Sequence, residues 1–268
     1  MRALFRRLYR GLQRCAMSEW RDEDLGRSAM VVAPHPDDEV LGCGGTVLRK
    51  RRLGADVKIV FVSDGSGSHA GLISAEELRA VRAGEAVSAA EALGVGKGDV
   101  ELLGLPDGHL AEQEDAGARK VAEVIGRDRP AEVFVPYYQD GPSDHHATTR
   151  MVAAALADCR HTATVYEYPV WFWYHWPWTR AEGRGRALLR SLRQGTARTW
   201  NMLRDFHCFV RVGDVLPLKR AALERHRSQV ERLRPDPAWL TLGDIAGGDF
   251  LKCFFQDREI FYRHPAGK

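Results

Sequence analysis

The sequence predicts an α/β fold in which a mostly parallel sheet is covered by helices on both faces. From residue 28 onward, short runs of β-branched residues alternate with longer windows of helical periodicity, which is typical of successive βα units. The chain has 268 residues, of which 44% are hydrophobic, and this is enough to bury the core of one large domain. We therefore expect one Rossmann-like three-layer domain over residues 25–268 and a separate segment over residues 1–24.

Each predicted element follows from the local pattern. The strands are expected at 29–32, 57–62, 100–103, 133–135 and 163–166, and the helices between them at 39–52, 75–93, 113–126 and 145–157. Gly94 and Gly126 stand where helix C-terminal caps are expected. Beyond residue 166 the pattern weakens, and a strand near 208–212, a helix near 216–233 and a last strand near 260–262 complete the domain.

Two segments carry both basic and apolar residues. The first 20 residues place Leu4, Phe5, Leu8, Tyr9 and Leu12 at helical spacing among five arginines, which predicts a basic amphipathic helix. This helix either packs on the body of the protein, extends from it, or contacts a membrane surface. Residues 166–178 hold four of the seven tryptophans and precede an arginine-rich stretch over 180–198. These aromatic residues pack the core, stack on sugar rings, or rest on an anionic membrane.

The composition excludes several classes of protein. Lys+Arg number 39 against 36 Asp+Glu, giving a net charge of +3, which is too balanced for a protein devoted to nucleic acid. The five cysteines include no C-x-x-C pair, which excludes a zinc-finger scaffold and argues against a disulfide framework. No apolar run approaches the roughly 20 residues of a membrane span, and the first residues lack a secretory signal. We expect a cytoplasmic protein, with peripheral membrane contact left open.

Polar residues follow the first and fourth strands, whose carboxyl ends share one edge of a parallel sheet. His35 and Asp38 are three residues apart at a strand-to-helix turn, so they can converge on one divalent metal while Asp37 stays free. His145 follows the fourth strand and brings a second imidazole to the same edge. Two histidines and one carboxylate leave a coordination position open for water, as a catalytic zinc site requires.

The order of these motifs resembles that of the LmbE-like (PIG-L) de-N-acetylases. The resemblance covers about residues 30–149, with weaker agreement at 166–169, 226–229 and 259–262. Four motifs carry it, each placed after a predicted strand: His35-Pro36-Asp37-Asp38-Glu39, Ser63-Asp64-Gly65, Leu105-Pro106-Asp107-Gly108 and Asp144-His145. Residues 25–268 would accordingly form a single LmbE-like deacetylase domain.

The resemblance implies a metal-dependent hydrolase that removes acetyl from an N-acetylated amino sugar or glycoconjugate, such as one containing N-acetylglucosamine. By position, His35, Asp38 and His145 would bind the metal, Zn²⁺ or alternatively Fe²⁺, and Asp37 would be the general base that activates the metal-bound water. The substrate would be a small or lipid-linked amino sugar.

One position departs from the family pattern. The family's second motif reads His-x-Asp-His, and its first histidine helps to stabilise the oxyanion, whereas this chain has Pro142 there. Asp144, which in the family tunes that histidine, remains a catalytic candidate. His146 and Tyr138 share the same loop and are the first candidates to replace the missing donor, and His109 and His264 are further ones.

Four residues are candidates for substrate binding. Asp64 lies in the loop after the second strand, which the resemblance makes a wall of the pocket. Arg82 and Glu85 match the family's Arg-x-x-Glu, so Arg82 either holds a sugar hydroxyl or phosphate or forms an exposed ion pair. Asp107 and His109 follow the third strand, although Asp107 can also be explained as part of a Pro-Asp-Gly turn.

Two other functions stay open at this point. Pro142 allows a catalytically impaired protein that binds glycans or glycolipids. Residues 65–70 match the spacing G-x-G-x-x-A, which suggests a nucleotide-binding oxidoreductase. The match follows the second strand, however, and the nearest acidic residue at a strand end, Asp107, lies much further along than the roughly 20 residues expected. Neither a Gly-x-Ser-x-Gly elbow nor a P-loop is present.

Overall fold

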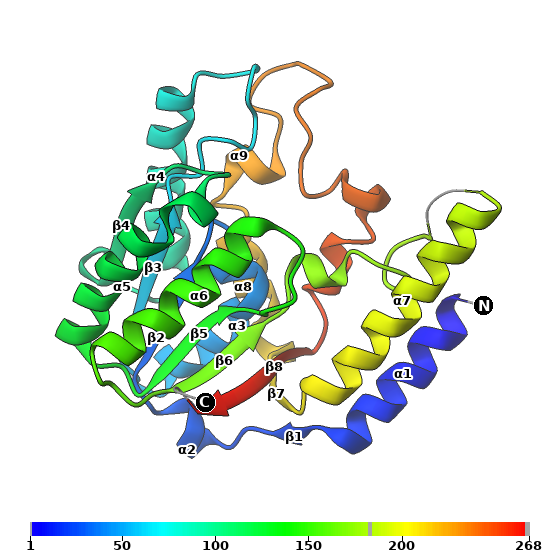
Figure 1. Cartoon of the computed structure of the whole chain (residues 1–268), viewed down its shortest axis with the longest axis horizontal. Coiled ribbons are helices and arrows are strands. Elements are labelled where there is room, and N and C mark those ends of the chain that lie inside the picture. Colours follow the sequence, from blue (N-terminus) through cyan, green and yellow to red (C-terminus); the bar gives the residue numbers. More distant parts are fainter. Residues whose placement is uncertain (1, 182–183, 266–268) are drawn as a thin grey trace.

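The five strands expected from the sequence form the parallel part of the sheet (Figure 1). The structure, a computed structural model, describes residues 2–181 and 184–265, without the side chains of residues 14 and 15. The strands, in their order across the sheet, are β4 (Val100–Leu105), β3 (Val57–Ser63), β2 (Ala29–Ala33), β5 (Glu132–Pro136) and β6 (Thr164–Tyr168). The predicted fold class is confirmed.

Three further strands extend the sheet beyond β6. The last strand of the chain, β8 (Arg258–Pro265), runs antiparallel to β6, and β7 (Cys208–Arg211) runs antiparallel to β8. The short β1 (Ser18–Glu19) pairs in parallel with β7 at the outer edge. The sheet is therefore mixed, and its antiparallel part comes from the region where the sequence pattern was weakest.

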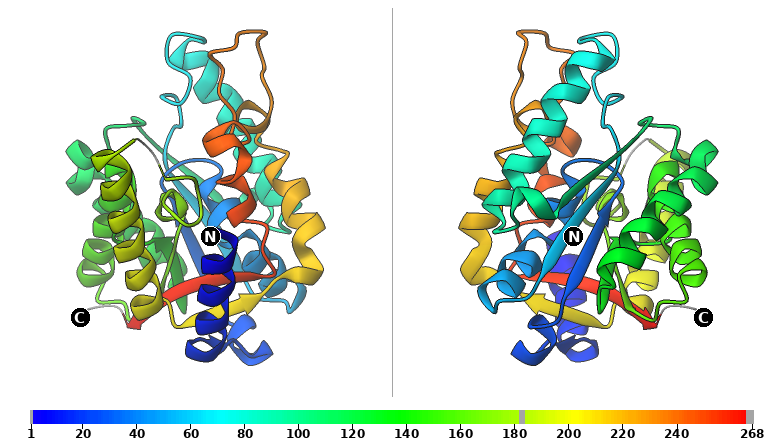
Figure 2. Two further views of the ribbon diagram at one scale, coloured as in Figure 1. Left: turned by 90° about the vertical axis from the view of Figure 1, so that its right-hand side faces the viewer. Right: turned by 90° about the vertical axis from the view of Figure 1, so that its left-hand side faces the viewer.

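Helices cover both faces of the sheet (Figure 2). Met30 and Val32 point toward α5 (Glu114–Asp128) and α6 (Ser143–Asp158). Val31 and Ala33 point the other way. That face is covered by α3 (Asp38–Arg52), α4 (Ala75–Ala92) and α8 (Leu216–Leu223). Because successive side chains of a strand alternate between faces, a strand buried on both sides must be apolar throughout, and β2 is.

Two of the helix predictions need correction, and one helix was not predicted. The helix expected over 216–233 is divided into α8 and α9 (Arg227–Val230), because His226 leaves the helical conformation, with ψ at 61°, and turns its ring to Glu39. The helix α5 does not stop at Gly126 and ends at Arg129, whose φ of 42° closes it. The arginine-rich stretch belongs to a long helix, α7 (Arg186–Asp205), that the sequence analysis did not assign.

The predicted N-terminal helix is present as α1 (Arg2–Ala16), and it lies beside α7 (Figure 1). A single turn, α2 (Asp22–Leu25), joins this region to β2. No described helix is long and apolar enough to cross a membrane. The remaining helical elements are short 3₁₀ turns: η1 (Lys97–Asp99), η2 (Leu110–Gln113), η3 (Trp171–Trp173), η4 (Gly213–Val215), η5 (Ile245–Gly248) and η6 (Leu251–Cys253).

Residues 166–178 mostly pack the core. Trp173 and Trp178 are buried, and they contact each other edge to face with ring centroids 4.9 Å apart. Trp171 is half-buried and turns toward the site described below. The four cysteines that the structure describes with their side chains are all free thiols.

Candidate active site

The loops that follow β2, β3, β4 and β5 meet at the carboxyl edge of the sheet, together with the first turns of α3 and α6. They surround a cavity of about 500 Å³. Its polar floor includes His35, Asp37 and Asp38. The apolar wall of the cavity consists of Leu41, Val170, Trp171, Leu240, Leu242, Ile245 and Phe250. The cavity can therefore hold a polar reacting group and an apolar or sugar-ring surface at the same time.

The three expected metal ligands lie together. Asp38 Oδ2 is 3.2 Å from His35 Nδ1 and 3.4 Å from His145 Nε2. One potential ligand atom of each residue lies within 4.8 Å of those of the other two. Asp38 opens α3 and His145 lies in the first turn of α6, so the sheet brings together two helix starts that are more than 100 residues apart.

The surroundings of His145 fit a bound cation. The side chain is fully buried, and neither ring nitrogen has a hydrogen-bond partner among the described residues. Its Nδ1 is 2.8 Å from Asp140 Oδ2, although the angle is not that of a hydrogen bond. A buried imidazole without partners is costly, and a metal at Nε2 would remove that cost while Asp140 orients the ring. Two nitrogens and one carboxylate oxygen are ligands that Zn²⁺ and Fe²⁺ accept.

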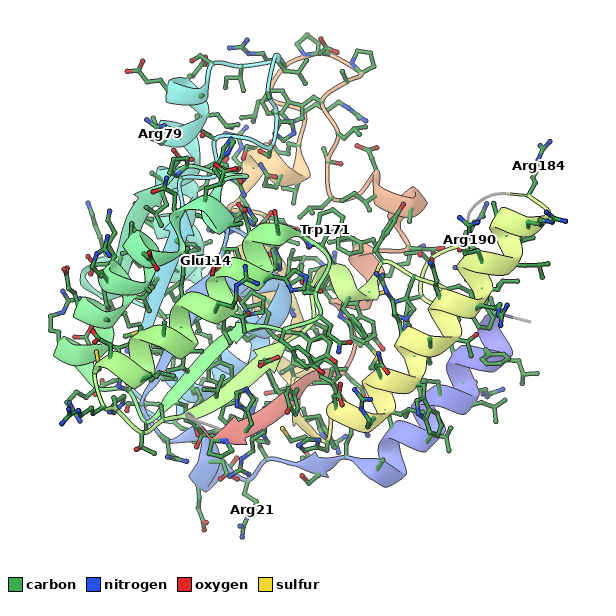
Figure 3. The ribbon with its side chains drawn as sticks, viewed as in Figure 1. Arg21, Arg79, Glu114, Trp171, Arg184 and Arg190 are labelled. Atoms are coloured by element: carbon green, nitrogen blue, oxygen red, sulfur yellow. The ribbon has the colours of Figure 1, made fainter. Side chains whose placement is uncertain are left out.

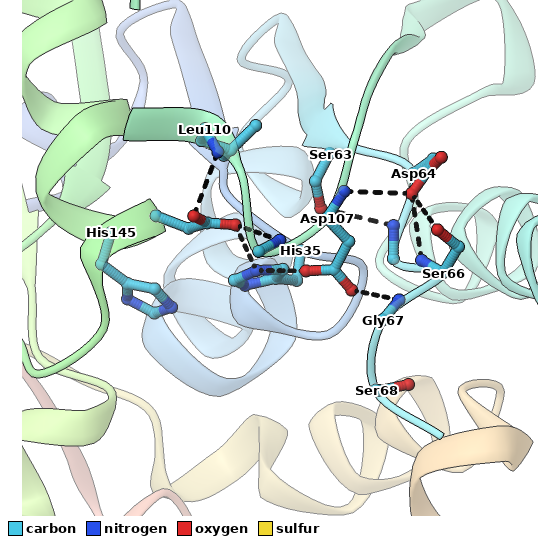
Figure 4. Close-up of polar contacts among 12 residues, drawn as sticks. His35, Ser63, Asp64, Ser66, Gly67, Ser68, Asp107, Leu110 and His145 are labelled. Atoms are coloured by element: carbon cyan, nitrogen blue, oxygen red, sulfur yellow. Dashed lines mark hydrogen bonds and ion pairs between the residues drawn. The ribbon is translucent and has the colours of Figure 1, made fainter. Parts of the chain in front are cut away.

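The second nitrogen of His35 faces two other carboxylates (Figure 4). Its Nε2 is 3.0 Å from Asp107 Oδ1 and 3.3 Å from Asp144 Oδ2. Burial opposes a charge on this ring, but Asp107, Asp144 and Asp38 together raise the pKa of His35 well above its ordinary value. Burial likewise opposes ionisation of Asp107, yet the contact with His35 and the amide of Gly67 lower the pKa of Asp107 to about 2.

His35, Asp107 and Asp144 form a second group with metal-ligand distances. The carboxylates of this group accept backbone N–H groups, as Asp38 Oδ2 also does from His35 at 3.1 Å, so the two groups differ mainly in the partners of their histidine nitrogens. Asp107 accepts from Gly67, and Asp144 accepts from Gly108 at 2.8 Å and from Leu110 at 3.2 Å. The group containing His145, whose nitrogens lack partners, is therefore the better candidate for a metal.

Asp37 has an unusual backbone conformation. Its φ of 132° is a region that side chains rarely occupy, and such strain is found mainly at functional sites. The backbone N–H of Asp37 donates to Glu39 Oε2 at 2.9 Å, and Glu39 Oε1 is 2.7 Å from His226 Nε2. Both supporting side chains are fully buried. The pair holds Asp37 at the N-terminus of α3 with its carboxylate on the cavity floor.

The carboxyl group of Asp37 can exchange a proton near neutral pH. Burial raises the pKa of Asp37 to about 7, against the attraction of the guanidinium of Arg82, whose Nη2 is 3.6 Å away. A group with a pKa near the working pH serves both as proton acceptor and as proton donor.

Arg82 is buried and has mainly local partners. It donates to the backbone carbonyls of Gly65 and Pro36, so it joins the loops after β2 and β3 at the cavity wall. The alternative of an exposed ion pair with Glu85 is wrong: Arg82 is only 2% exposed, and Glu85 accepts hydrogen bonds from the amide and hydroxyl of Ser228.

The other candidates lie outside the set of residues that lines the cavity. Asp64 accepts from Ser66 and from the amide of Asp107, and so shapes the turn after β3 (Figure 4). His109 is exposed and pairs with Glu112 at 3.0 Å. Tyr138 is exposed and packs on Tyr137 and Tyr262, and the half-buried His146 also stays away from the floor.

The sequence analysis gave no role to Asp140, although its Oδ2 lies 2.8 Å from His145 Nδ1. Its carboxylate accepts the backbone N–H groups of Trp171 and Phe172, so it links the loop after β5 to the apolar wall. The only signal in the sequence is an acidic residue five positions before a candidate histidine ligand. That signal is weak without the three-dimensional arrangement.

Residues 30–156 match a protein family described as PIG-L: GlcNAc-PI de-N-acetylase. This match confirms the resemblance to the PIG-L de-N-acetylases over that part of the chain. It is 32% identical over 126 residues to a diacetylchitobiose deacetylase of Thermococcus kodakarensis, a match that covers 45% of this chain and 46% of the relative. The chain thus spans about half the length of that relative.

Two further comparisons extend over most of the chain. A 1D-myo-inositol 2-acetamido-2-deoxy-alpha-D-glucopyranoside deacetylase of Thermomonospora curvata is 29% identical over 262 residues, covering 77% of this chain and 82% of the relative. The structure of the N,N'-diacetylchitobiose deacetylase from Pyrococcus horikoshii superposes with a TM-score of 0.65 at 19% identity, covering 98% of this chain and 92% of that one. The likeness in structure supports the PIG-L fold.

The PIG-L pattern accounts for most of the site but not for Pro142. This residue precedes the first turn of α6 and lines the cavity. Asp144, expected to have lost its usual partner, instead contacts His35 and fastens the loop after β4. The nucleotide-binding alternative finds no support in the loop after β3, because α4 begins only at Ala75, and the fingerprint requires glycines that open a helix directly.

Proposed function

We propose that the protein is a metal-dependent hydrolase that removes the acetyl group from an N-acetylated amino sugar or glycoconjugate. The observation that carries the proposal is the buried imidazole of His145, which has no hydrogen-bond partner among the described residues and lies beside Asp38. Asp38, His35 and Asp37 line the cavity floor. The names of the relatives, deacetylases of diacetylchitobiose and of an acetamido sugar joined to inositol, support the same class of substrate.

His35, Asp38 and His145 would hold the divalent cation, Zn²⁺ or alternatively Fe²⁺. When bound, such a cation supplies Lewis acidity toward the acyl oxygen and the attacking water. Asp37 takes a proton from the water while the water oxygen forms a bond to the acyl carbon. The carboxyl group of Asp37 then gives that proton to the sugar nitrogen, the C–N bond breaks, and acetate and a free amine leave.

The cavity suits an amino sugar. The acetamido group would face the polar floor, while the indole of Trp171 and the neighbouring apolar wall would cover the face of a sugar ring. The same wall leaves room for an apolar aglycone, so lipid-linked amino sugars belong among the substrates to be tested. Asp107 and Arg82 would bind the sugar, and their place in the lining of the cavity supports this role.

The proposal is tested by acetate release. The purified protein should bind one metal ion and release acetate from diacetylchitobiose or N-acetylglucosaminyl-inositol, and Asp37→Asn should lower kcat by about 100-fold or more, which is typical for loss of a general acid-base group. Asp115→Ala, at an exposed position on α5, is the matched control and should keep full activity. Stoichiometric metal without Asp37-dependent acetate release from any amino sugar tried contradicts the proposal.

Pro142 favours a second candidate, a protein that keeps the metal and binds glycans but turns over poorly. Losing one oxyanion donor costs about 100-fold to 1000-fold in kcat. If this second function holds, wild type binds an N-acetylated sugar with negligible turnover and Pro142→His creates acetate release. Robust turnover by wild type excludes it.

A further inference from the structure

The amphipathic helix α1 turns its apolar stripe toward solvent. Leu4, Leu8 and Leu12 recur every four residues along one side of the helix and are 63%, 59% and 56% exposed. The neighbouring Phe5 is also exposed, at 42%. A helix that packs on a globular body normally buries this stripe. In α1 each of the three leucines stays more than half exposed, and Phe5 at the edge of the stripe contacts the ring of Trp176, with centroids 4.8 Å apart.

The inward side of α1 explains this orientation. Arg6 donates to the backbone carbonyls of Pro177 and Trp178, and the ring of Tyr9 packs edge-on against Trp178 at 5.3 Å. At the start of the helix Arg2 pairs with Asp249. The polar side of the helix therefore holds it to the body, and these contacts fix the leucines on the outside.

The surface around the leucine stripe is basic. The helix has five arginines and no acidic residue, and the exposed Arg7 and Arg10 form no hydrogen bond or ion pair with another residue in the described part of the chain. The adjacent α7 repeats the pattern, with five arginines, a single acidic residue at its last position, and Leu189 and Trp200 exposed by 61% and 69%. Figure 3 shows Arg184, just before α7, reaching away from the body of the protein.

We propose that α1, together with the adjacent α7, docks on the surface of an anionic phospholipid bilayer. Exposed leucines beside unpaired arginines are the features of a helix that lies in the plane of a membrane interface, with apolar side chains among the acyl chains and guanidinium groups among the phosphates. A second copy of the chain is a poor occupant, because an isologous contact would place two arginine-rich faces against each other.

Vesicle sedimentation with the full-length chain tests this proposal. Wild type should sediment with vesicles of equal parts phosphatidylglycerol and phosphatidylcholine and stay in the supernatant with phosphatidylcholine alone. Salt at about 1 M, where the Debye length falls to ~3 Å, should weaken the binding. The double variant Arg7→Glu/Arg10→Glu should weaken it by about fivefold or more for each arginine.

The apolar stripe is tested separately. The triple variant Leu4→Ser/Leu8→Ser/Leu12→Ser should reduce the vesicle-bound fraction about tenfold or more while acetate release from a soluble substrate and the circular dichroism spectrum stay as in wild type. Leu53→Ser, just after α3, and Leu218→Ser, on α8, are matched controls at positions 47% and 43% exposed and should bind like wild type.

Two outcomes overturn the proposal. One is wild-type protein that remains in the supernatant with anionic vesicles. The other is a dimer in light scattering that the triple variant converts to a monomer, without vesicle binding by either protein, since a second copy then covers the stripe.

Discussion

The substitution Asp140→Asn tests whether Asp140 positions a metal ligand or only stabilises the fold. Asp140 is fully buried, and its two oxygens accept the backbone N–H groups of Trp171 and Phe172, while Oδ2 also lies 2.8 Å from His145 Nδ1. Asparagine keeps the shape but replaces one oxygen with an NH₂ group. Whichever oxygen is replaced, the new NH₂ group faces a backbone N–H group, so at least one hydrogen bond is lost.

The expected losses follow from these contacts. A hydrogen bond to a charged group contributes about 1.5–3 kcal/mol, so the free energy of unfolding should fall by about 2 kcal/mol. A carboxylate that orients a histidine ligand contributes about 10–100-fold to metal affinity or activity, so the Kd for Zn²⁺ should rise by about that factor. Urea unfolding of the metal-free protein measures the first loss, and a competitive zinc titration measures the second.

Asp205→Asn is the matched control. Asp205 is also buried and accepts a hydrogen bond from Tyr137, but it lies outside the set of candidate ligands. This variant should lose stability and keep the zinc affinity of wild type. If Asp140→Asn behaves in the same way, Asp140 only anchors residues 171–172, and the reasoning about His145 is refuted.

Two further predictions concern stability. Gly42→Ala should lower the free energy of unfolding, measured in urea, by about 1–3 kcal/mol or more, because the new Cβ would lie 2.1 Å from the ring of the buried Tyr168. Gly84→Ala, at an exposed helix position with open space around it, should be neutral or stabilising. Equal effects of the two substitutions would contradict this packing argument. The hydrogen bond from His264 to Glu167 raises the pKa of His264, so its stabilising effect is fully present below about pH 6.5 and disappears as the pH rises through the folded-state pKa. The Tm difference between wild type and His264→Gln should therefore shrink from about pH 6 to about pH 9, and a difference that grows with pH would contradict the assignment.

The fold class and the candidate metal-ligand group were accessible from the sequence because they depend on local geometry and on one topological rule. Alternating apolar runs and helical windows predict strands and helices, since side chains repeat every two residues in a strand and every 3.6 in a helix. Parallel strands end at the same edge of the sheet, so His35 and His145 were expected to lie near each other. A ring nitrogen of each histidine lies within 3.4 Å of Asp38 Oδ2.

The supporting residues around the site could not be predicted in this way. The contacts made by Asp140, Glu39 and His226 join residues up to 187 positions apart in the sequence. Whether such contacts form depends on how α9 and the loop after β5 pack. The pattern of residues 216–233 favours one helix, but the contact between His226 and Glu39 divides it.

The amphipathic pattern of residues 1–20 established that a helix forms, and the four motifs indicated which residues carry the chemistry. Only the tertiary structure decided which side of that helix is buried and which residues orient the ligands. The physical reason is that periodicity sets where side chains lie on one element, whereas burial depends on the surface that a distant part of the chain offers. For α1 that surface consists of backbone carbonyls and an indole ring, so the arginines and Tyr9 pack inward and the leucines stay outside.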